Sequence, residues 1–456
     1  MRHQDENKAH REDGRRLDLF YLDKPAVSFA IHFIKAYEID KKRRANVEKA
    51  EIEERMKGMP QELHRIIDFR TPAMTPPNRL IFGFGAADQV GAEAANMVEG
   101  RKALIISDEV LEKLNAIDQI SSSLSSAGFS VDTFARVEPE PHIETAEALY
   151  DMCKGSDFSV LVALGGGSIM DIAKLTAQAA GRGRSPRDYV ERKVTPDGPG
   201  LPLIVLPTTS GTGSEVSFYL VCAVGEEKRF FFDPYYFANM AIIDPLLTVS
   251  MPPLVTASTG IDALTHAVEG MMHKNANPLG DTFGLAGIEM IGRYLRRAVV
   301  DGEDLEARYY MSMGASLGMM AFMLAGGLFA HSVSYILPMY KFTPHGIGCG
   351  LGLPYLMDYN LPVVAGKLAK MAAALGEQTW MLSQIDAAKR AVQSVARLMK
   401  DTGLPLTLEQ YGGLEESDLE EMADKMITIY PRPMNPRPMG KKEAIQYWRT
   451  MWDGTL

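Results

Sequence analysis

Cysteine is scarce in this sequence, which has three in 456 residues. Cys153, Cys222 and Cys349 lie far apart and form no CxxC pair. The sequence therefore supports neither a disulfide framework nor a thiolate metal site. A reducing compartment is the expectation, and we assign the protein to the cytoplasm by default.

Basic residues are also fewer than acidic ones. The 48 Lys and Arg residues against 58 Asp and Glu residues give a formal net charge of -10. Such a chain repels phosphate backbones overall, so we expect no nucleic-acid partner unless a local basic patch exists. With 46% hydrophobic and 23% charged residues, the composition is typical of a globular protein and argues against wholesale disorder or a coiled-coil rod.

Long uncharged runs are rare. The first residues are charged and show no apolar run before a cleavage site, so we expect no secretory signal. Between Arg308 and Lys341, however, the segment MSMGASLGMMAFMLAGGLFA is long enough to span a bilayer. It stands alone and is rich in Gly, Ser and Ala. We therefore favour a helix buried in a large helical domain and expect no membrane association.

The composition predicts three parts of the chain. Residues 1–71 form an N-terminal extension with closely mixed charges, which we expect to be partly helical. Its apolar segment LFYLDKPAVSFAIHFI predicts packing against the main body or another subunit, with a weakly ordered tail as the alternative. We expect a homodimer or larger homo-oligomer, for which residues 1–70 are the candidate assembly segment.

Strand and helix patterns alternate over residues 72–250. The β-branched runs 103–106 (ALII), 160–163 (VLVA) and 203–206 (LIVL) are each followed by a polar or glycine-rich turn and then by helical periodicity. This pattern predicts a parallel sheet in an α/β domain. From residue 251 to residue 456 the strand pattern stops, which predicts an all-helical second domain.

Two loops after predicted strands have the composition of phosphate-binding loops. In LGGGSIMDIAK, residues 164–174, glycines allow close approach of a ligand, Ser168 is placed to cap the next helix, and Asp171 completes a capping-box spacing. In PTTSGTGSEVS, residues 207–217, hydroxyl side chains alternate with glycines. A capped strand-to-helix turn and an exposed Ser/Thr loop are the alternatives. Neither loop has the GxGxxG spacing of the usual dinucleotide fingerprint.

Asp108 ends the strand-like segment ALIISD. A carboxylate there is able to accept both hydroxyls of a ribose and would repel a 2′-phosphate, which favours NAD over NADP. A cap of the following helix is the alternative.

Four residues form a candidate metal site. Asp262 and His266 are four residues apart and so share a helix face. His331 lies in the uncharged segment, and His345 follows Pro344. An aspartate with three imidazoles suits Fe2+ or Zn2+. A surface pair and a hydrogen-bonded core histidine are the alternatives.

Together, GGGSIMDIAK, PTTSGTGSEVS, DPLLTVSMPP, TGIDALTHAVEG and the pair His331 and His345 resemble the iron-containing (group III) alcohol dehydrogenases of the dehydroquinate synthase-like superfamily. The resemblance runs from about Asn78 to about Asn360. It implies an α/β dinucleotide-binding domain followed by a helical metal-binding domain, with the active site in the cleft between them.

The resemblance also implies roles for individual residues. The implied metal ligands are Asp262, His266, His331 and His345, for iron or zinc. The implied cofactor contacts are Asp108, Gly166, Gly167, Ser168, Thr208, Thr209, Thr212, Ser217 and Lys228, with NAD as the cofactor rather than NADP.

Three positions depart from the family pattern. Tyr335 stands where many members have a histidine that is thought to help proton transfer, so we assign it the proton-relay role, for which its ordinary pKa near 10 makes it a poorer group. Glu140 replaces a common Asn near the adenine, and Phe342 replaces a frequent polar residue. These changes affect the proton path and the identity of the substrate.

The resemblance implies an NAD(H)-dependent and metal-dependent alcohol dehydrogenase or aldehyde reductase. It would transfer a hydride between nicotinamide and a small alcohol or aldehyde. One alternative is a phosphorylated substrate, as for glycerol-phosphate dehydrogenase or dehydroquinate synthase. Another is a non-catalytic NAD-binding protein with an assembly role.

Overall fold

The computed structural model describes residues 77–225 and 227–455, which belong to one compact unit. The predicted charged extension, its helix and its assembly role lie outside the described residues. The change from strands to helices falls between Ile243, the end of the last strand, and Pro253, the start of the first long helix. The boundaries at residues 72, 250 and 251 remain predictions.

Six parallel strands form the sheet of the first region, in the order β1-β8-β5-β4-β2-β3. The predicted runs ALII, VLVA and LIVL lie within β2, β4 and β5, which are almost fully buried, as expected for strands covered on both faces. The predicted parallel α/β sheet is confirmed. The strands are β1 (Arg79–Phe82), β2 (Lys102–Ile106), β3 (Ser130–Phe134), β4 (Val160–Gly165), β5 (Leu203–Pro207) and β8 (Met240–Ile243).

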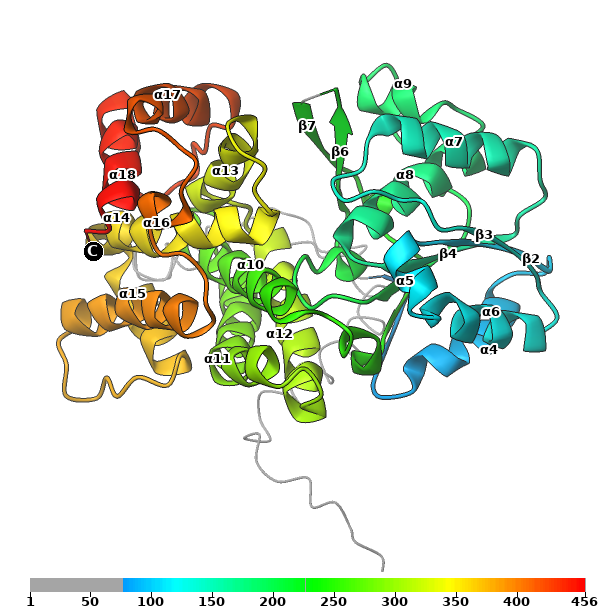
Figure 1. Ribbon diagram of the computed structural model, residues 1–456, viewed down its shortest axis with the longest axis horizontal. Coiled ribbons are helices and arrows are strands. Elements are labelled where there is room, and N and C mark those ends of the chain that lie inside the picture. The colour runs from blue at the N-terminus through cyan, green and yellow to red at the C-terminus, as the bar shows by residue number, and fades with distance from the viewer. Residues whose placement is uncertain (1–76, 226, 456) are drawn as a thin grey trace, which may run out of the picture. The chain divides into compact units, whose positions relative to one another are not determined.

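Helices cover both faces of this sheet. In Figure 1, α4 and α6 lie on one face, and α7 and α8 lie on the other. The order in which strands are added to the sheet reverses between β2 and β4. The chain places β3 on one side of β2 and then adds β4, β5 and β8 in turn on the other side. Such a switch point opens a crevice for ligands at the carboxyl ends of the strands. The helices are α4 (Val90–Met97), α5 (Glu109–Lys113), α6 (Ala116–Ser126), α7 (Ile143–Lys154), α8 (Gly167–Arg182) and α9 (Pro186–Val190).

An antiparallel hairpin that the sequence pattern did not predict follows the second loop. Its strands are β6 (Tyr219–Val224) and β7 (Glu227–Phe232). The ring of Phe230 lies 4.4 Å from that of Tyr335 in the helical region, centroid to centroid. The hairpin therefore contacts both halves of the described chain.

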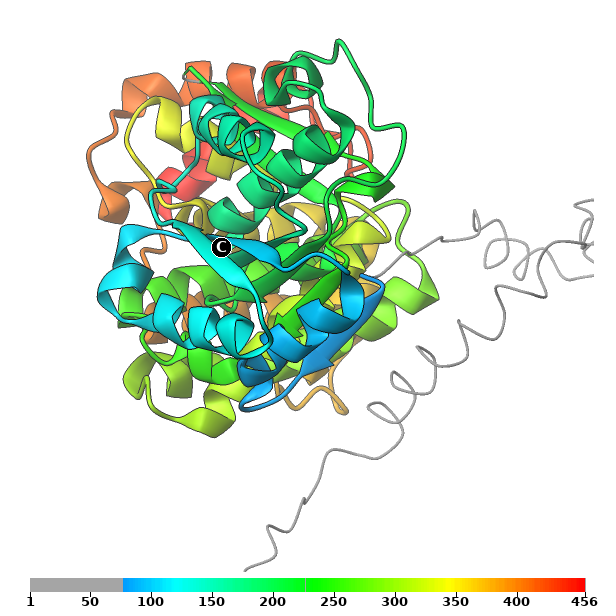
Figure 2. The ribbon, with the colours of Figure 1, turned by 90° about the vertical axis from the view of Figure 1, so that its right-hand side faces the viewer.

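The second region is helical throughout, as predicted, and lies behind the α/β region when the latter faces the viewer (Figure 2). Its core is a cluster of buried side chains from all its long helices. The helices are α10 (Pro253–Met272), α11 (Pro278–Val300), α12 (Leu305–Met323), α13 (Phe329–Ile336), α14 (His345–Ala374), α15 (Gln384–Asp401), α16 (Leu408–Tyr411), α17 (Leu419–Ile429) and α18 (Lys441–Asp453).

The uncharged segment is not the single helix that we expected. It forms α12, a break over residues 324–328, and the start of α13, which carries His331. Gly326 in the break has a φ of +121°, which side chains rarely tolerate. Among the described residues, no helix combines the length and hydropathy needed to cross a bilayer.

Small residues bring α10, α11 and α12 into close contact. A Cβ atom added at Gly318 would lie 2.7 Å from the carbonyl oxygen of Ala263 in α10. One added at Gly287 in α11 would lie 3.1 Å from the carbonyl oxygen of Gly314 in α12. Backbone thus packs directly on backbone, which explains why this uncharged segment is rich in glycine.

Candidate metal and cofactor site

A cavity of about 720 Å³ is lined by residues from both the α/β region and the helical region. It brings together ten of the residues proposed from the sequence, five for the cofactor, four for the metal and one for proton transfer. They are Gly167, Ser168, Thr212, Ser217, Lys228, Asp262, His266, His331, Tyr335 and His345.

The start of α8 forms one wall of the cavity. The helix begins at Gly167 directly after β4, so its first backbone N–H groups have no partner within the helix and suit a phosphate. A Cβ atom added at Gly167 would lie 2.7 Å from the methyl group of Thr212. A larger residue at position 167 would therefore collide with the second loop. The two loops that were predicted separately therefore pack against each other.

The predicted capping box in the first loop is wrong. Gly166 is the N-cap of α8, which places Ser168 inside the first turn. Asp171 instead accepts hydrogen bonds from Ser214 Oγ at 2.6 Å and from the backbone N–H of Val221 at 2.9 Å. Its carboxylate thus ties α8 to the second loop and to the hairpin.

Lys174, which also lies on α8, makes further contacts with the second loop and the hairpin. Its side chain is 1% exposed, and its Nζ donates to Ser214 Oγ at 2.6 Å and to the carbonyl of Tyr219 at 3.0 Å. The Asp171 carboxylate lies 3.7 Å away. Burial raises the pKa of Asp171 and lowers that of Lys174, and each group partly offsets the shift of the other. The sequence analysis missed this pair, although its i, i+3 spacing lies within the GGGSIMDIAK motif.

Four predicted cofactor residues do not line the cavity. Thr208 donates its N–H to the carbonyl of Gly165 at 3.1 Å, and the Thr209 side chain lies against Gly166. Asp108 caps α5 by accepting from the N–H of Leu111 at 2.8 Å, which is the alternative considered from the sequence. Since Asp108 follows β2 at the switch point of the sheet, its role in ribose binding stays a prediction.

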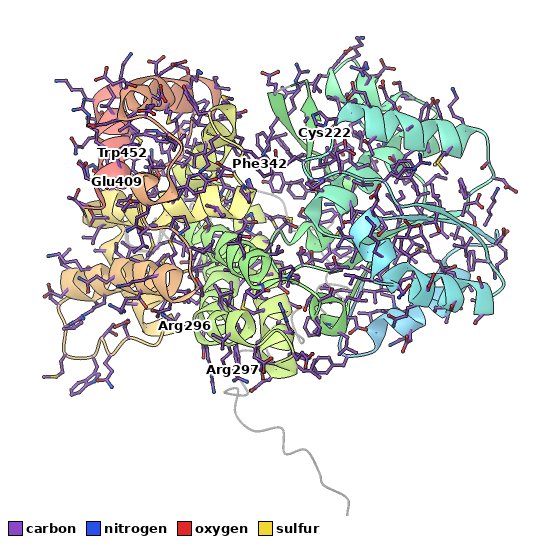
Figure 3. The ribbon with its side chains drawn as sticks, in the orientation of Figure 1. Cys222, Arg296, Arg297, Phe342, Glu409 and Trp452 are labelled. Atoms are coloured by element: carbon purple, nitrogen blue, oxygen red, sulfur yellow. The ribbon has the colours of Figure 1, made fainter. Side chains whose placement is uncertain are left out.

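Lys228 enters the cavity from β7 in an ion pair. Its Nζ lies 2.7 Å from Glu140 Oε1, and both residues line the cavity. Glu140 therefore neutralises the lysine proposed to contact the cofactor. Phe342 lies outside this lining; it is 70% exposed and projects from the helical region (Figure 3).

Three helices place the proposed metal ligands. Asp262 and His266 lie one turn apart on α10, His331 lies on α13, and His345 is the first residue of α14. Asp262 Oδ1 is 3.9 Å from His331 Nε2 and 3.7 Å from His345 Nε2. Metal bonds of about 2.0–2.2 Å in a tetrahedral site give donor separations of about 3.3–3.6 Å, which is close to these distances.

Buried polar atoms without partners mark the same place. Within the described part of the chain, Asp262 Oδ1, His266 Nδ1 and His331 Nε2 have no hydrogen-bond partner. Unsatisfied buried atoms are costly, and Asp262 Oδ1 and His331 Nε2, which lie 3.9 Å apart, would both be satisfied by one bound cation. These residues fit a divalent cation.

The closest group of donor atoms differs from the predicted quartet. Asp262, His331, His345 and Cys349 each offer an atom within 4.8 Å of the others, and Cys349 Sγ is 3.7 Å from His345 Nε2. His266 is outside this group, although its ring centroid is 4.8 Å from that of His331. A thiol at this site was not predicted, because Cys349 has no cysteine neighbour in the sequence.

Buried partners orient two of the histidines. Glu269 Oε2 lies 2.7 Å from His331 Nδ1, and Ser334 Oγ lies 2.5 Å from His345 Nδ1, so each ring turns its Nε2 away from these partners, and that of His345 contacts Cys349 Sγ. Burial lowers the pKa of His266 to about 3 and also lowers that of His345, which keeps both rings neutral. Burial raises the pKa of Glu269, but His331 and backbone N–H donors bring it below its ordinary value. The sequence analysis missed Glu269, which lies within TGIDALTHAVEG.

Replacing Glu269 by glutamine is expected to weaken metal binding by about 10- to 100-fold. The neutral amide is a poorer acceptor for the His331 N–H and no longer balances the positive charge of a bound cation. Competition with a chromogenic chelator measures the effect. Glu409→Gln, which changes an exposed residue of α16, is the matched control (Figure 3). Equal metal affinity of the two variants would contradict this role.

Tyr335 lies one turn after His331 and 5.4 Å from the His345 ring, centroid to centroid. Burial raises its pKa well above 10. The phenol is therefore neutral at physiological pH, so it is able to donate a hydrogen bond but not to act as a base.

Comparison with known proteins agrees with this geometry. The family model described as iron-containing alcohol dehydrogenase matches residues 77–245, and that of the Fe-containing alcohol dehydrogenase family, C-terminal, matches residues 256–452. Long-chain-alcohol dehydrogenase 1 of Geobacillus thermodenitrificans is 40% identical over 82% of this chain and 95% of its own length.

Solved structures agree as well. A 1,3-propanediol oxidoreductase superposes with a TM-score of 0.80 at 33% identity, covering 84% of this chain and all of that one. A sulfoacetaldehyde reductase from Bifidobacterium kashiwanohense, in complex with NAD+, superposes with a TM-score of 0.76 at 26% identity, covering 83% and 98%. With both family models matched and the cavity formed between their two parts, the chain belongs to the iron-containing alcohol dehydrogenases, oxidoreductases that interconvert alcohols and aldehydes.

Proposed function

We propose that this protein is an NAD(H)-dependent alcohol dehydrogenase or aldehyde reductase for small substrates, with a divalent metal held by Asp262, His266, His331 and His345. The supporting observation is the set of three buried donor atoms without partners beside the cavity. A bound Fe2+ or Zn2+ supplies Lewis acidity, which polarises an aldehyde carbonyl or lowers the pKa of an alcohol.

The chain's own groups position the reactants. The N-terminus of α8 faces the cavity and supports a pyrophosphate, with Ser168 and Thr212 beside it. Phe230, Phe322 and Tyr335 supply apolar walls that exclude water from the reacting atoms. The neutral Tyr335 hydroxyl is a candidate donor to the substrate oxygen.

Elemental analysis of the purified protein, combined with NADH oxidation against a panel of aldehydes, tests this proposal. We expect about one iron or zinc per chain and oxidation of NADH that depends on an aldehyde. A protein without metal that oxidises NADH with no aldehyde in the panel would contradict the proposal and favour the non-catalytic alternative.

Asp108→Ser is expected to relax the preference for NAD, with an improvement in kcat/KM for NADP of about 10-fold or more. The substitution removes the negative charge next to the proposed ribose position, while serine preserves the α5 cap. Steady-state kinetics with both cofactors measure the ratio. Asp304→Ser, which alters another helix cap distant in the fold, is the control. An unchanged ratio would leave Asp108 with its capping role alone.

Assembly and location are inferred from the sequence. We infer a homo-oligomer, with residues 1–70 as the candidate assembly segment, and a cytoplasmic location from the scarcity of cysteine. The three cysteines are all free in the structure.

A further inference from the structure

We propose that Arg432 binds an anionic group at the far end of the substrate, so that the preferred substrates are short aldehydes or alcohols carrying a carboxylate or sulfonate. This inference rests on the proposed dehydrogenase activity and names its substrate class. It comes from the placement and the charge balance of one residue in the connection between α17 and α18.

Arg432 lines the same cavity as the proposed metal ligands. Its Nε donates to Ser332 Oγ at 2.9 Å, and the Ser332 hydroxyl donates to the carbonyl of Tyr430 at 2.9 Å. Ser332 is buried and is the neighbour of His331 on α13. One edge of the guanidinium is therefore fixed to α13 at the wall of the cavity, and its two terminal nitrogens have no hydrogen-bond partner among the described residues.

The charges around the cavity leave Arg432 uncompensated. Lys228 is paired with Glu140. Glu269 accepts a hydrogen bond from the His331 ring and lies within electrostatic range of Arg432 without forming an ion pair with it. Among the described residues, no ion pair includes Arg432, and its hydrogen bond to Ser332 is with a neutral group. Burial lowers the pKa of nearby His273 to about 4, so that ring adds no charge at neutral pH.

Other groups within electrostatic range do not neutralise the guanidinium. The hydroxyls of Tyr219 and Tyr430 have pKa values raised by burial, so both are neutral. Asp262 and Glu269 are the two negative groups that a bound divalent cation would balance. The cavity with metal bound therefore carries a net positive charge at Arg432, which attracts an oxyanion and repels a quaternary ammonium group.

The geometry favours a monoanion. A guanidinium with two free nitrogens matches the two oxygens of a carboxylate or sulfonate. Among the cationic side chains that line the cavity, Lys228 is already paired, so a second free cation for a phosphate dianion is missing from the described residues. Because Arg432 is anchored to the residue after His331 and lines the same cavity, we expect a short chain between the anion and the reacting carbon.

The experiment compares matched aldehydes in the holoenzyme. We expect kcat/KM for 4-oxobutanoate to exceed that for butanal by about 10-fold or more, since a charge-assisted pair is worth that much. In Arg432→Met the KM for 4-oxobutanoate is expected to rise by about 10- to 100-fold while the KM for butanal stays the same. Arg432→Lys should recover part of the loss. Sulfoacetaldehyde and glyceraldehyde 3-phosphate distinguish sulfonate and phosphate from carboxylate.

Arg437→Met, in the same connection but outside the cavity lining, is the control. Equal losses for butanal and 4-oxobutanoate in Arg432→Met would show a purely structural role and overturn the inference. A preference for the phosphorylated aldehyde would overturn the assigned class of anion.

Calorimetric binding of 4-hydroxybutanoate to the holoenzyme separates this inference from the activity. Binding by the parent protein that Arg432→Met loses supports the inference even if no aldehyde is reduced, in which case the proposed function alone fails. Equal binding by both proteins, or none by the parent protein, overturns the inference.

Discussion

Replacing His345 by alanine is expected to remove most of the bound metal and to lower kcat/KM for aldehyde reduction by about 1,000-fold or more. His345 is the first residue of α14, and its Nε2 lies 3.7 Å from Asp262 Oδ1. Loss of one imidazole opens the donor set, and the Lewis acidity that the reaction depends on is lost with the metal. Metal content by elemental analysis and turnover by NADH oxidation measure the two effects.

His142→Ala, which changes a partly exposed histidine at the start of α7, is the matched control. Cobalt substitution of the parent protein adds a spectroscopic measurement of the same donors. An intense sulfur-to-metal charge-transfer band would place Cys349 in the coordination sphere, and its absence would leave oxygen and nitrogen donors only. Normal metal content and full turnover in His345→Ala would show that the metal assignment is wrong.

Lys174→Met is expected to lower the free energy of unfolding by about 3–5 kcal/mol, the usual cost of removing one partner from a buried ion pair. Methionine nearly preserves the volume but leaves Asp171 without its positive partner and Ser214 without a donor. Because Asp171 also holds the hairpin through Val221, the loss should weaken the contacts between the two cofactor loops. Denaturant unfolding measures the change.

The control is Lys113→Met, which removes an exposed i, i+4 ion pair with Glu109 and is expected to cost less than about 0.5 kcal/mol. Replacing both Lys174 and Asp171 by apolar residues should recover part of the stability, because no unpaired charge then remains buried. Equal stability of Lys174→Met and Lys113→Met would refute this account.

Local patterns predicted the sheet but not the hairpin. The runs within β2, β4 and β5 are continuous and β-branched because both faces of these strands are covered. The strands β6 and β7 follow a loop that was interpreted only for its hydroxyl groups. The hairpin they form packs against residues distant in the sequence, such as Tyr335, and local patterns do not reveal such contacts. Gly326 likewise breaks the uncharged segment where periodicity alone predicts a continuous helix.

The proposed metal ligands could be named from the sequence, but the groups around them could not. Spacing placed Asp262 and His266 on one helix face, His331 and His345 were added from their places in the uncharged segment and after Pro344, and the family resemblance implied the same four residues. The residues that support or complement this site come from other turns and other elements, and only the fold brings them together. Arg432 is the clearest case, because it lies 100 residues from its partner Ser332.

The close packing of α12 on α10 has a consequence for the electrostatics of the reaction. The carbonyl of Ala263, next to Asp262, lies so close to Gly318 that a single methyl group would not fit between them. A helix held backbone to backbone has little room for thermal displacement, so the carboxylate and imidazole it carries keep one arrangement while charge moves between substrate and nicotinamide. We therefore expect the glycines that make this segment resemble a membrane span to lower the reorganisation energy of the reaction.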